Sequence, residues 1–410
     1  MTDVRMKGFF EKTPVDETLK IILKRINPLP SEKIKITDAP GRVLASVVKA
    51  SMDIPPFNRS AMDGYAVRGE DTFGATQTNP ISFKVIGEVL PGSSFDKRIG
   101  EFTAAKIMTG GRVPEGADAV VMLEYTSGRS EIEVIKAVSP GKNVSLQGED
   151  FKKGDVALEG GRVLTAQDVG ILAALGVGEL EVGRRPSVGI ISSGDEVAAP
   201  GEKIKEGEIY DINGHVLSSL ARHAGGLPEF LGIIKDDYEA LKNAIKNSLD
   251  FDVIVLSGAT SVGEKDVIPA IARELGEVLV HGVSMRPGAP TGFGIINDRP
   301  VFMLPGHPAA TIFGFEVFVR PALQKMQGAE PYNPYPTIEG VLKKKIASEL
   351  GRRDFVWVKV DEKGSVDPIR TSSSGIVSRL LLANGFVVVP ENTEGLREGK
   401  KVEVSMFRNL

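Results

Sequence analysis

The 410-residue sequence contains no cysteine, which excludes disulfides, zinc–thiolate sites, iron–sulfur clusters and cysteine nucleophiles. It also lacks a surplus of basic residues, because 50 lysines and arginines stand against 54 aspartates and glutamates. A balanced charge gives no reason to expect a nucleic acid or a membrane surface as partner. No apolar signal core opens the chain, and no hydrophobic run approaches membrane-spanning length. We therefore expect a cytoplasmic protein with no nucleic-acid partner and no membrane partner.

The length and the changes of pattern along the chain predict several domains. Short β-branched segments between turns, from about 65 to 138, predict a small β domain. From Arg185 onward, strand–loop–helix repeats predict a mostly parallel sheet in a three-layer α/β domain. A proline-rich segment, Pro331–Pro336, predicts a linker to a C-terminal β domain. The predicted fold is multidomain α/β, with an N-terminal module (1–51 and 141–180), an inserted β domain (52–140), a central α/β domain (181–328) and a C-terminal β domain (329–410).

One stretch of the central domain predicts an anion site. Asp252–Ser257 is a buried strand by its composition, a glycine loop follows it, and Asp266 caps the next helix. Free backbone N–H groups and a helix N-terminus favour a phosphate there. The carboxylates of Glu264 and Asp266 would repel that anion unless a cation such as Mg2+ lay between them. The loop is not a P-loop, because Glu264 and Lys265 stand where Lys and Ser or Thr are required, and by itself it could be only a turn.

Three loops that follow strands of the predicted sheet carry acidic residues. They are Asp195–Glu196, Asp236–Asp237 and Glu264–Asp266. The carboxyl ends of parallel strands meet at one edge of a sheet, so these loops should lie in one crevice. A single acidic loop is usually a helix cap, but three around a glycine-lined pocket favour a metal–phosphate site.

Capping residues predict where several helices begin. Thr13 before Pro14 predicts the first helix, and Thr165 with Asp168 predicts a capping box. The other two starts are predicted at Asn213 and at a second capping box, Asp236 with Glu239.

Seven motifs, in order along the chain, resemble those of the molybdopterin molybdenumtransferases, the family that includes MoeA and the E domain of gephyrin. They are SAMDGYAV, KIMTGGRVPEGADAVV, SSGDEV, GEIYDIN, SGATSVGEKD, SMRPGAPTGFG and LPGHPAA. The resemblance implies an elongated, four-domain homodimer with a linker and dimerisation module, a molybdopterin-binding central domain and a barrel-like C-terminal domain. It also implies insertion of molybdate into adenylylated molybdopterin with Mg2+-dependent release of AMP. The molybdopterin adenylyltransferase of the preceding step is then a candidate partner.

The resemblance also assigns site residues by motif position. Those with a catalytic role would be Asp63, Asp150, Asp195, Glu196, Asp236 and Asp266. The metal ligands would come from Asp195, Glu196, Asp236 and Asp266. Ligand contacts would come from Thr109, Gly258, Ser261, Gly263, Arg286, Pro290, Arg352 and Ser374. Apart from the resemblance, arginine forks and serine hydroxyls in the C-terminal loops suit oxyanions, although such residues also serve solubility alone.

Three loops depart from the family pattern, and in one of them the usual GGVSVG is replaced by GATSVG at residues 258–263. The loop usually written K-P-G-K-P is Arg286-Pro287-Gly288-Ala289-Pro290, and the loop usually written P-G-N-P-x-S ends in Ala310. One cation and one hydroxyl are therefore missing, which leaves molybdate and tungstate both open as substrate. Two alternative functions stay open. One is a cofactor carrier or scaffold without catalysis, and the other is the preceding adenylyltransferase step.

Overall fold

The structure is a computed structural model that describes residues 12–258, 267–369 and 378–408. The described chain separates into two compact units, one formed by Met1–Lys33, Gly41–Ala45 and Glu181–Leu410 and the other by Ile34–Pro40 and Ser46–Leu180. The chain crosses between the units four times, and the first and last crossings fall within β1 (Ser31–Lys35) and β12 (Glu179–Gly183). Among the described residues, no helix is long and apolar enough to cross a membrane.

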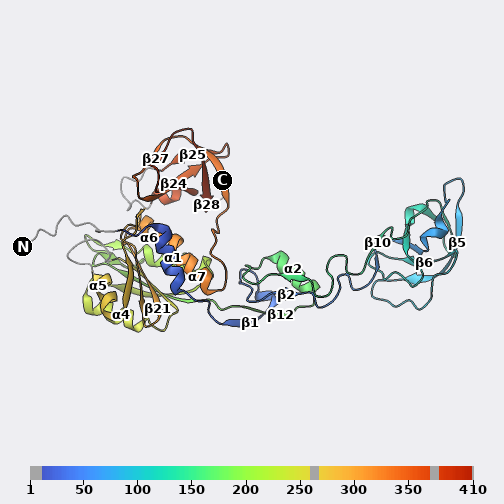
Figure 1. The fold of residues 1–410 in the computed structure, drawn as a ribbon, viewed down its shortest axis with the longest axis horizontal. Helices are drawn as coiled ribbons and strands as arrows, with labels where there is room; N and C mark the ends of the chain where they lie inside the picture. The colour runs from blue at the N-terminus through green and yellow to red at the C-terminus, as the bar shows by residue number, and fades with distance from the viewer. Residues whose placement is uncertain (1–11, 259–266, 370–377, 409–410) are drawn as a thin grey trace, which may run out of the picture. The chain divides into compact units, whose positions relative to one another are not determined.

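A six-stranded sheet forms the centre of the first unit, in the order β16-β13-β17-β21-β20-β18 (Figure 1). The first four strands run parallel, whereas β20 and β18 are antiparallel to their neighbours. The bounds are Leu227–Ile234, Ser187–Ser193, Val253–Ser257, Arg299–Leu304, Gly292–Ile296 and Glu277–His281, in the same order. Every residue of β17 is buried, as expected for a central strand with helices on both faces.

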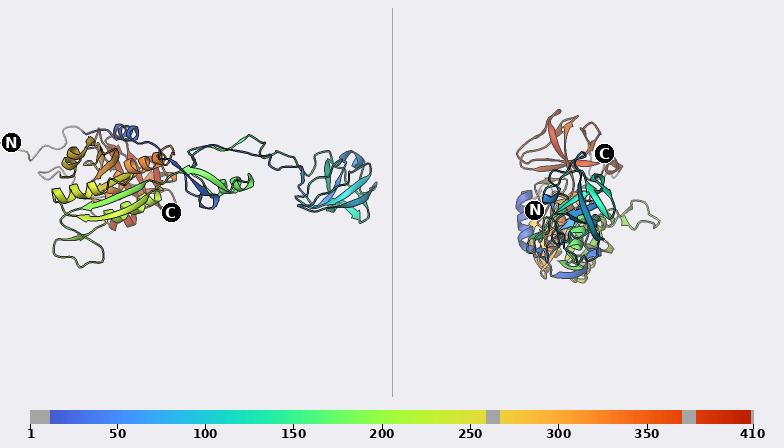
Figure 2. Two further views of the ribbon diagram at one scale, coloured as in Figure 1. Left: turned by 90° about the horizontal axis from the view of Figure 1, so that it is seen from below. Right: turned by 90° about the vertical axis from the view of Figure 1, so that its right-hand side faces the viewer.

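Helices cover both faces of this sheet (Figures 1 and 2). On one face, α4 (Tyr238–Asn247) and α5 (Val267–Leu275) pack over Ile191, Ile254 and Leu256. On the other face lie helices whose aromatic and aliphatic side chains form a second core. They are α1 (Val15–Arg25), α3 (Asn213–His223), α6 (Pro308–Gly314), the π-helical turn η5 (Phe315–Val319) and α7 (Arg320–Met326). The predicted three-layer α/β fold with a mostly parallel sheet is confirmed.

The C-terminal strands close into a small barrel. The order is β19-β24-β25-β22-β28-β26, and β26 also pairs with β24. The bounds are Met285–Arg286, Arg353–Val360, Ser365–Pro368, Thr337–Leu342, Lys401–Met406 and Gly385–Val389. Smaller elements are β23 (Ile346–Ala347), β27 (Gly395–Leu396) and α8 (Ser378–Leu382). Phe313 of α6 packs on Trp357 of β24, with ring centroids 4.4 Å apart, so the barrel shares a core with the α/β layers.

The second unit contains a six-stranded sheet in the order β7-β4-β6-β5-β9-β8. The bounds are Ala119–Met122, Gly64–Val67, Thr103–Ile107, Ile81–Val89, Glu131–Val134 and Thr126–Gly128. Two short antiparallel pairs join distant segments, β3 (Arg59–Ser60) with β10 (Val144–Ser145) and β2 (Val48–Lys49) with β11 (Val156–Leu158). The finer four-part division predicted from the sequence stays a prediction.

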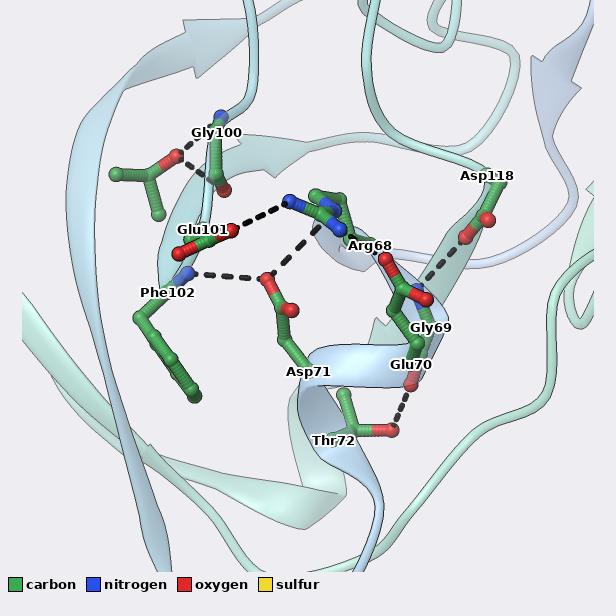
Figure 3. A network of polar contacts seen from close by, with 10 residues as sticks. Arg68, Gly69, Glu70, Asp71, Thr72, Gly100, Glu101, Phe102 and Asp118 are labelled. Carbon is green, nitrogen blue, oxygen red and sulfur yellow. Dashed lines mark hydrogen bonds and ion pairs between the residues drawn. The ribbon is translucent and has the colours of Figure 1, made fainter.

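A polar network lies where β4 ends and β6 begins (Figure 3). Arg68 lies beside the carboxylates of Glu70, Asp71 and Glu101. Asp71 Oδ2 also accepts a hydrogen bond of 3.0 Å from the backbone N–H of Phe102. Phe102 has a positive φ of 49°, an unfavourable conformation for a bulky residue, so this contact helps to hold a strained turn.

All four predicted helices form, but two of the predicted capping residues are wrong. Thr165 and Asp168 form the capping box of α2 (Ala166–Ala174), and α3 begins at Asn213. However, Thr13 does not cap α1, because its backbone pairs with Gly282 and Ser284 and the helix begins only at Val15. The other correction concerns α4, which is capped by Asp237 rather than Asp236.

Candidate functional site

The parallel strands β13 and β16 bring two of the predicted carboxylates together. Ser193 pairs with Ile234 at the carboxyl ends of these strands, so the loops that follow start side by side. Asp195 Oδ1 accepts a hydrogen bond of 3.2 Å from the backbone N–H of Asp236. Glu196 follows Asp195 and is exposed, like Asp195 itself. The sheet therefore presents an acidic edge of the kind that the strand pattern predicted.

A group of buried oxygen atoms lies behind this edge. Ser193, Asp211 and Asn213 each place one side-chain oxygen where water cannot reach it, with no hydrogen-bond partner among the described residues. Ser192 Oγ donates to the other oxygen of Asp211 over 2.9 Å. Gly258 comes so close that a Cβ there would lie 2.2 Å from the carbonyl oxygen of Ser193. The glycine at the end of β17 is therefore required by close packing, whatever its role toward a ligand.

A pocket of about 870 Å³ opens between the carboxyl ends of the α/β strands and the barrel. It contains three of the predicted ligand-binding residues, namely Arg286, Pro290 and Arg352. Further cationic or titratable groups come from Lys12, His307 and Lys345. The described lining residues include no Asp and no Glu. Such a lining suits an oxyanion.

Asp354 lies directly behind this pocket and contacts both arginines. Its side chain is completely buried, and it forms ion pairs with Arg286 and with Nε of Arg352, the latter over 2.9 Å. Ser348 donates a hydrogen bond of 2.8 Å to the same carboxylate. Arg352 Nη1 also contacts Glu349, while its Nη2 is buried without a partner among the described residues. Asp354 thus orients the arginines and neutralises much of their charge.

The pocket also has an apolar lining. It includes Phe355, Trp357 and Ile369, together with Ala309 and Ala310 at the start of α6. Trp357 is largely buried, and its Nε1 has no hydrogen-bond partner among the described residues. A flat organic ring could pack on these apolar side chains while its charged groups face the cations.

Two predicted residues of the second unit form a local pair. Asp63 Oδ1 accepts hydrogen bonds of 2.7 Å from both the backbone N–H and the hydroxyl of Thr109. The backbone N–H of Thr109, and next its hydroxyl, lower the pKa of Asp63. Asp150 is held elsewhere, since its backbone N–H donates to the carbonyl of Ile54. No hydrogen bond between described residues joins Asp150 to Asp63 or Thr109.

The predicted metal ligands are only partly described. Asp266 lies outside the described residues, as do Ser261, Gly263 and Ser374. Among the residues that the structure describes, no three His, Asp or Glu side chains come close enough to share a metal ion. Asp195, Glu196 and Asp236 nevertheless lie on adjoining loops at one strand edge.

Several residues that line the pocket or contact its arginines were not predicted from the sequence. Lys12 precedes the first helix, and Lys345 is the third lysine of a run, a pattern that usually marks a solvated surface. Asp354 sits in a β-rich segment with no motif around it. No local signal identifies these residues, because only the closure of the barrel against the α/β strands brings them to the pocket.

Family models match most of the chain. The MoeA N-terminal region (domain I and II) matches residues 13–176, and the MoeA C-terminal region (domain IV) matches residues 339–407. Between them, a domain described as "Probable molybdopterin binding domain" matches residues 189–325.

Individual relatives match along nearly their whole length. The chain is 41% identical to a molybdopterin biosynthesis protein of Methanocaldococcus jannaschii, over 98% of this chain and 100% of that protein. It is 35% identical to the molybdopterin molybdenumtransferase of Bacillus subtilis, over 96% of this chain and 94% of the relative. The crystal structure of the molybdopterin biosynthesis moeA protein from Pyrococcus horikoshii OT3 aligns with a TM-score of 0.86 at 36% identity, covering 97% of this chain and 100% of that one. The resemblance seen in the motifs is confirmed: the chain belongs to the MoeA family, an enzyme family of molybdenum cofactor biosynthesis.

Proposed function

We propose that this protein inserts molybdate or tungstate into adenylylated molybdopterin, with Mg2+-dependent release of AMP. The observation that carries the proposal is the pocket between the α/β strands and the barrel. Cationic and apolar side chains line this pocket, and no Asp or Glu among the described residues lines it. Cations suit the tetrahedral dianion, and the apolar side chains suit a flat heterocycle. Full-length similarity to the Bacillus subtilis molybdopterin molybdenumtransferase supports the same reaction.

In this proposal the pocket binds the oxyanion and the acidic edge binds the phosphate portion of the substrate. Arg286 and Arg352 are held by Asp354, so they present N–H donors in fixed directions. Cleavage of the phosphoanhydride consumes one water and yields AMP and the molybdopterin phosphate. The two dithiolene sulfurs then bind the metal of the oxyanion, and one oxo ligand leaves with the two thiol protons as water.

The acidic edge has the chemistry that Mg2+ requires. Mg2+ is commonly held by one or two carboxylates and keeps several of its waters. The backbone N–H of Asp236 donates to the carboxylate of Asp195, and Glu196 is adjacent and exposed. The acidic edge therefore offers the one or two carboxylates that Mg2+ needs. We assign Asp266 to the same set from its motif position. A bound Mg2+ would neutralise negative charge on the phosphoanhydride.

The remaining expectations belong to the same proposal. We infer a homodimer in which Asp63, Thr109 and Asp150 serve the reaction, a cytoplasmic location, and the molybdopterin adenylyltransferase of the preceding step as a candidate partner. Their support is the family membership. The side chain of Asp63 accepts two hydrogen bonds from Thr109 and is therefore held in one orientation, as a contributing carboxylate should be.

The test is AMP release from adenylylated molybdopterin with Mg2+, with molybdate and tungstate added in parallel. Release that depends on one oxyanion would support the proposal and identify the metal. Tight binding of the adenylate without release would instead favour a carrier or scaffold, and formation of the adenylate from ATP would favour the preceding step. In the variant D266N, turnover should fall sharply, and normal AMP release by that variant would contradict the metal assignment.

A further inference from the structure

The arginines of the pocket carry little uncompensated charge. Arg286 and Arg352 both contact the buried carboxylate of Asp354, and Arg352 also contacts Glu349. Two guanidinium charges are thus opposed by two carboxylates within ion-pair distance. A dianion that binds to these arginines meets well-placed N–H donors but almost no net positive charge.

Two lysines of the same pocket are not neutralised in this way. The ammonium groups of Lys12 and Lys345 have no carboxylate within ion-pair distance among the described residues, and both lysines line the pocket. The neighbours of Lys345 provide an internal comparison. Lys343 pairs with Asp361 over 3.0 Å and Lys344 with Asp367 over 2.9 Å, and neither of them lines the pocket.

The backbone fixes Lys12 at the pocket wall. The neighbouring Thr13 forms a parallel bridge with Val283, and its carbonyl accepts a hydrogen bond of 2.9 Å from the N–H of Ser284. The hydroxyl of Ser284 donates to the carbonyl of Lys12 over 3.3 Å. Val283 in turn donates to the carbonyl of Ala289 over 2.8 Å. Lys12 is therefore anchored next to the loop that contains Ala289, a residue that lines the pocket without a charge.

We propose that Lys12 and Lys345 supply the net positive charge that holds the oxyanion substrate, while the arginines orient it. This inference rests on the proposed function and adds two binding residues to it. The charge comes from the segment before the first helix and from the loop after β22, rather than from the loop of Arg286. Binding of the oxyanion then needs no positive charge at position 289, because Lys12 brings one to the same pocket from another segment.

The test measures binding of molybdate and of tungstate to the full chain by calorimetry at low salt, without the pterin substrate. Each of K12A and K345A should weaken binding of the preferred oxyanion about tenfold, and the double variant about a hundredfold. The matched control is K344A, which removes a lysine already paired with Asp367 and should leave the affinity unchanged. Binding should also weaken as salt increases, and less steeply in the double variant.

A charge-transfer variant separates lost charge from lost structure. In K12A/A289K the positive charge returns to the pocket from the neighbouring loop, so affinity should recover most of the loss seen in K12A. Equal affinities of wild type, K12A and K345A would overturn the inference while leaving the proposed function intact. Failure of K12A/A289K to recover, with both proteins folded, would also overturn it. If the wild type neither binds an oxyanion nor releases AMP in its presence, the proposed function itself fails.

Discussion

A buried ion pair in the helices before the proline-rich linker also accepts a hydrogen bond from that linker, so its contribution to stability can be predicted. Arg320 is 4% exposed and contacts Glu316 through Nε at 2.5 Å and Nη2 at 2.8 Å. Tyr335, in the proline-rich segment, donates a hydrogen bond of 2.7 Å to the same carboxylate. Burial raises the pKa of the Tyr335 hydroxyl, so it stays protonated and can donate at any ordinary pH. The ring of Tyr335 meets Phe386 of the barrel edge-on.

Replacing Arg320 with Met should destabilise the first unit by about 3–5 kcal/mol, because a buried carboxylate loses its counter-ion. The variant Y335F removes one hydrogen bond to a charged group and should cost about 1.5–3 kcal/mol. The triple variant E316L/R320M/Y335F removes the carboxylate, the guanidinium and the hydroxyl of this network together. It should therefore recover most of the stability lost in R320M.

The assay is urea unfolding followed by the fluorescence of Trp357, the single tryptophan of the chain. This residue packs on Phe313 and Phe386, so its signal reports the contact between the α/β layers and the barrel. With a urea dependence of about 3 kcal/mol per M, the expected loss in R320M moves the midpoint by roughly 1 M or more. A shift below about 0.3 M in R320M, or a triple variant as unstable as R320M, would refute the reasoning.

Two more predictions concern backbone packing and pH. The variant G258A should lower the free energy of unfolding by about 3 kcal/mol or more, because φ is +114° and the new Cβ would lie 2.2 Å from the Ser193 carbonyl oxygen. The control G41A, with φ +76° and free space around the new Cβ, should lower it by only about 1–2 kcal/mol. Equal thermal midpoints of the two variants would contradict this. The hydrogen bond from Arg353 lowers the pKa of Asp16, so this contact stabilises the fold above the unfolded pKa of about 4 and is lost as pH falls through the lower, folded value. Arg353 also pairs with Glu391 and lowers the pKa of that carboxyl in the same way. The difference in urea midpoint between wild type and R353M should therefore shrink between pH 6 and pH 3, and a constant difference would argue against both contacts.

The sequence by itself determined the layers of the fold. Apolar runs such as Val253–Ser257, set between turns and amphipathic helices, allow only a buried parallel sheet with helices on both faces. The strand ends then locate Asp195 and Asp236 at one edge, because parallel neighbours end at the same side. Helix starts were harder to predict where a backbone group had a competing partner, as at Thr13, which pairs with the 282–284 segment instead of capping α1.

The motifs predicted Arg286, Pro290 and Arg352 as ligand contacts, but only the tertiary structure shows that they share a pocket with lysines from other segments. Lys12, Arg286 and Lys345 are far apart in the sequence, and they meet only because β19 pairs with β24 and the chain before α1 pairs next to Val283. The sequence also did not show which of these cationic side chains is neutralised by a neighbouring carboxylate. Whether a lysine or arginine is free to bind an anion depends on the carboxylate that long-range packing places beside it, as Asp354 does for Arg286.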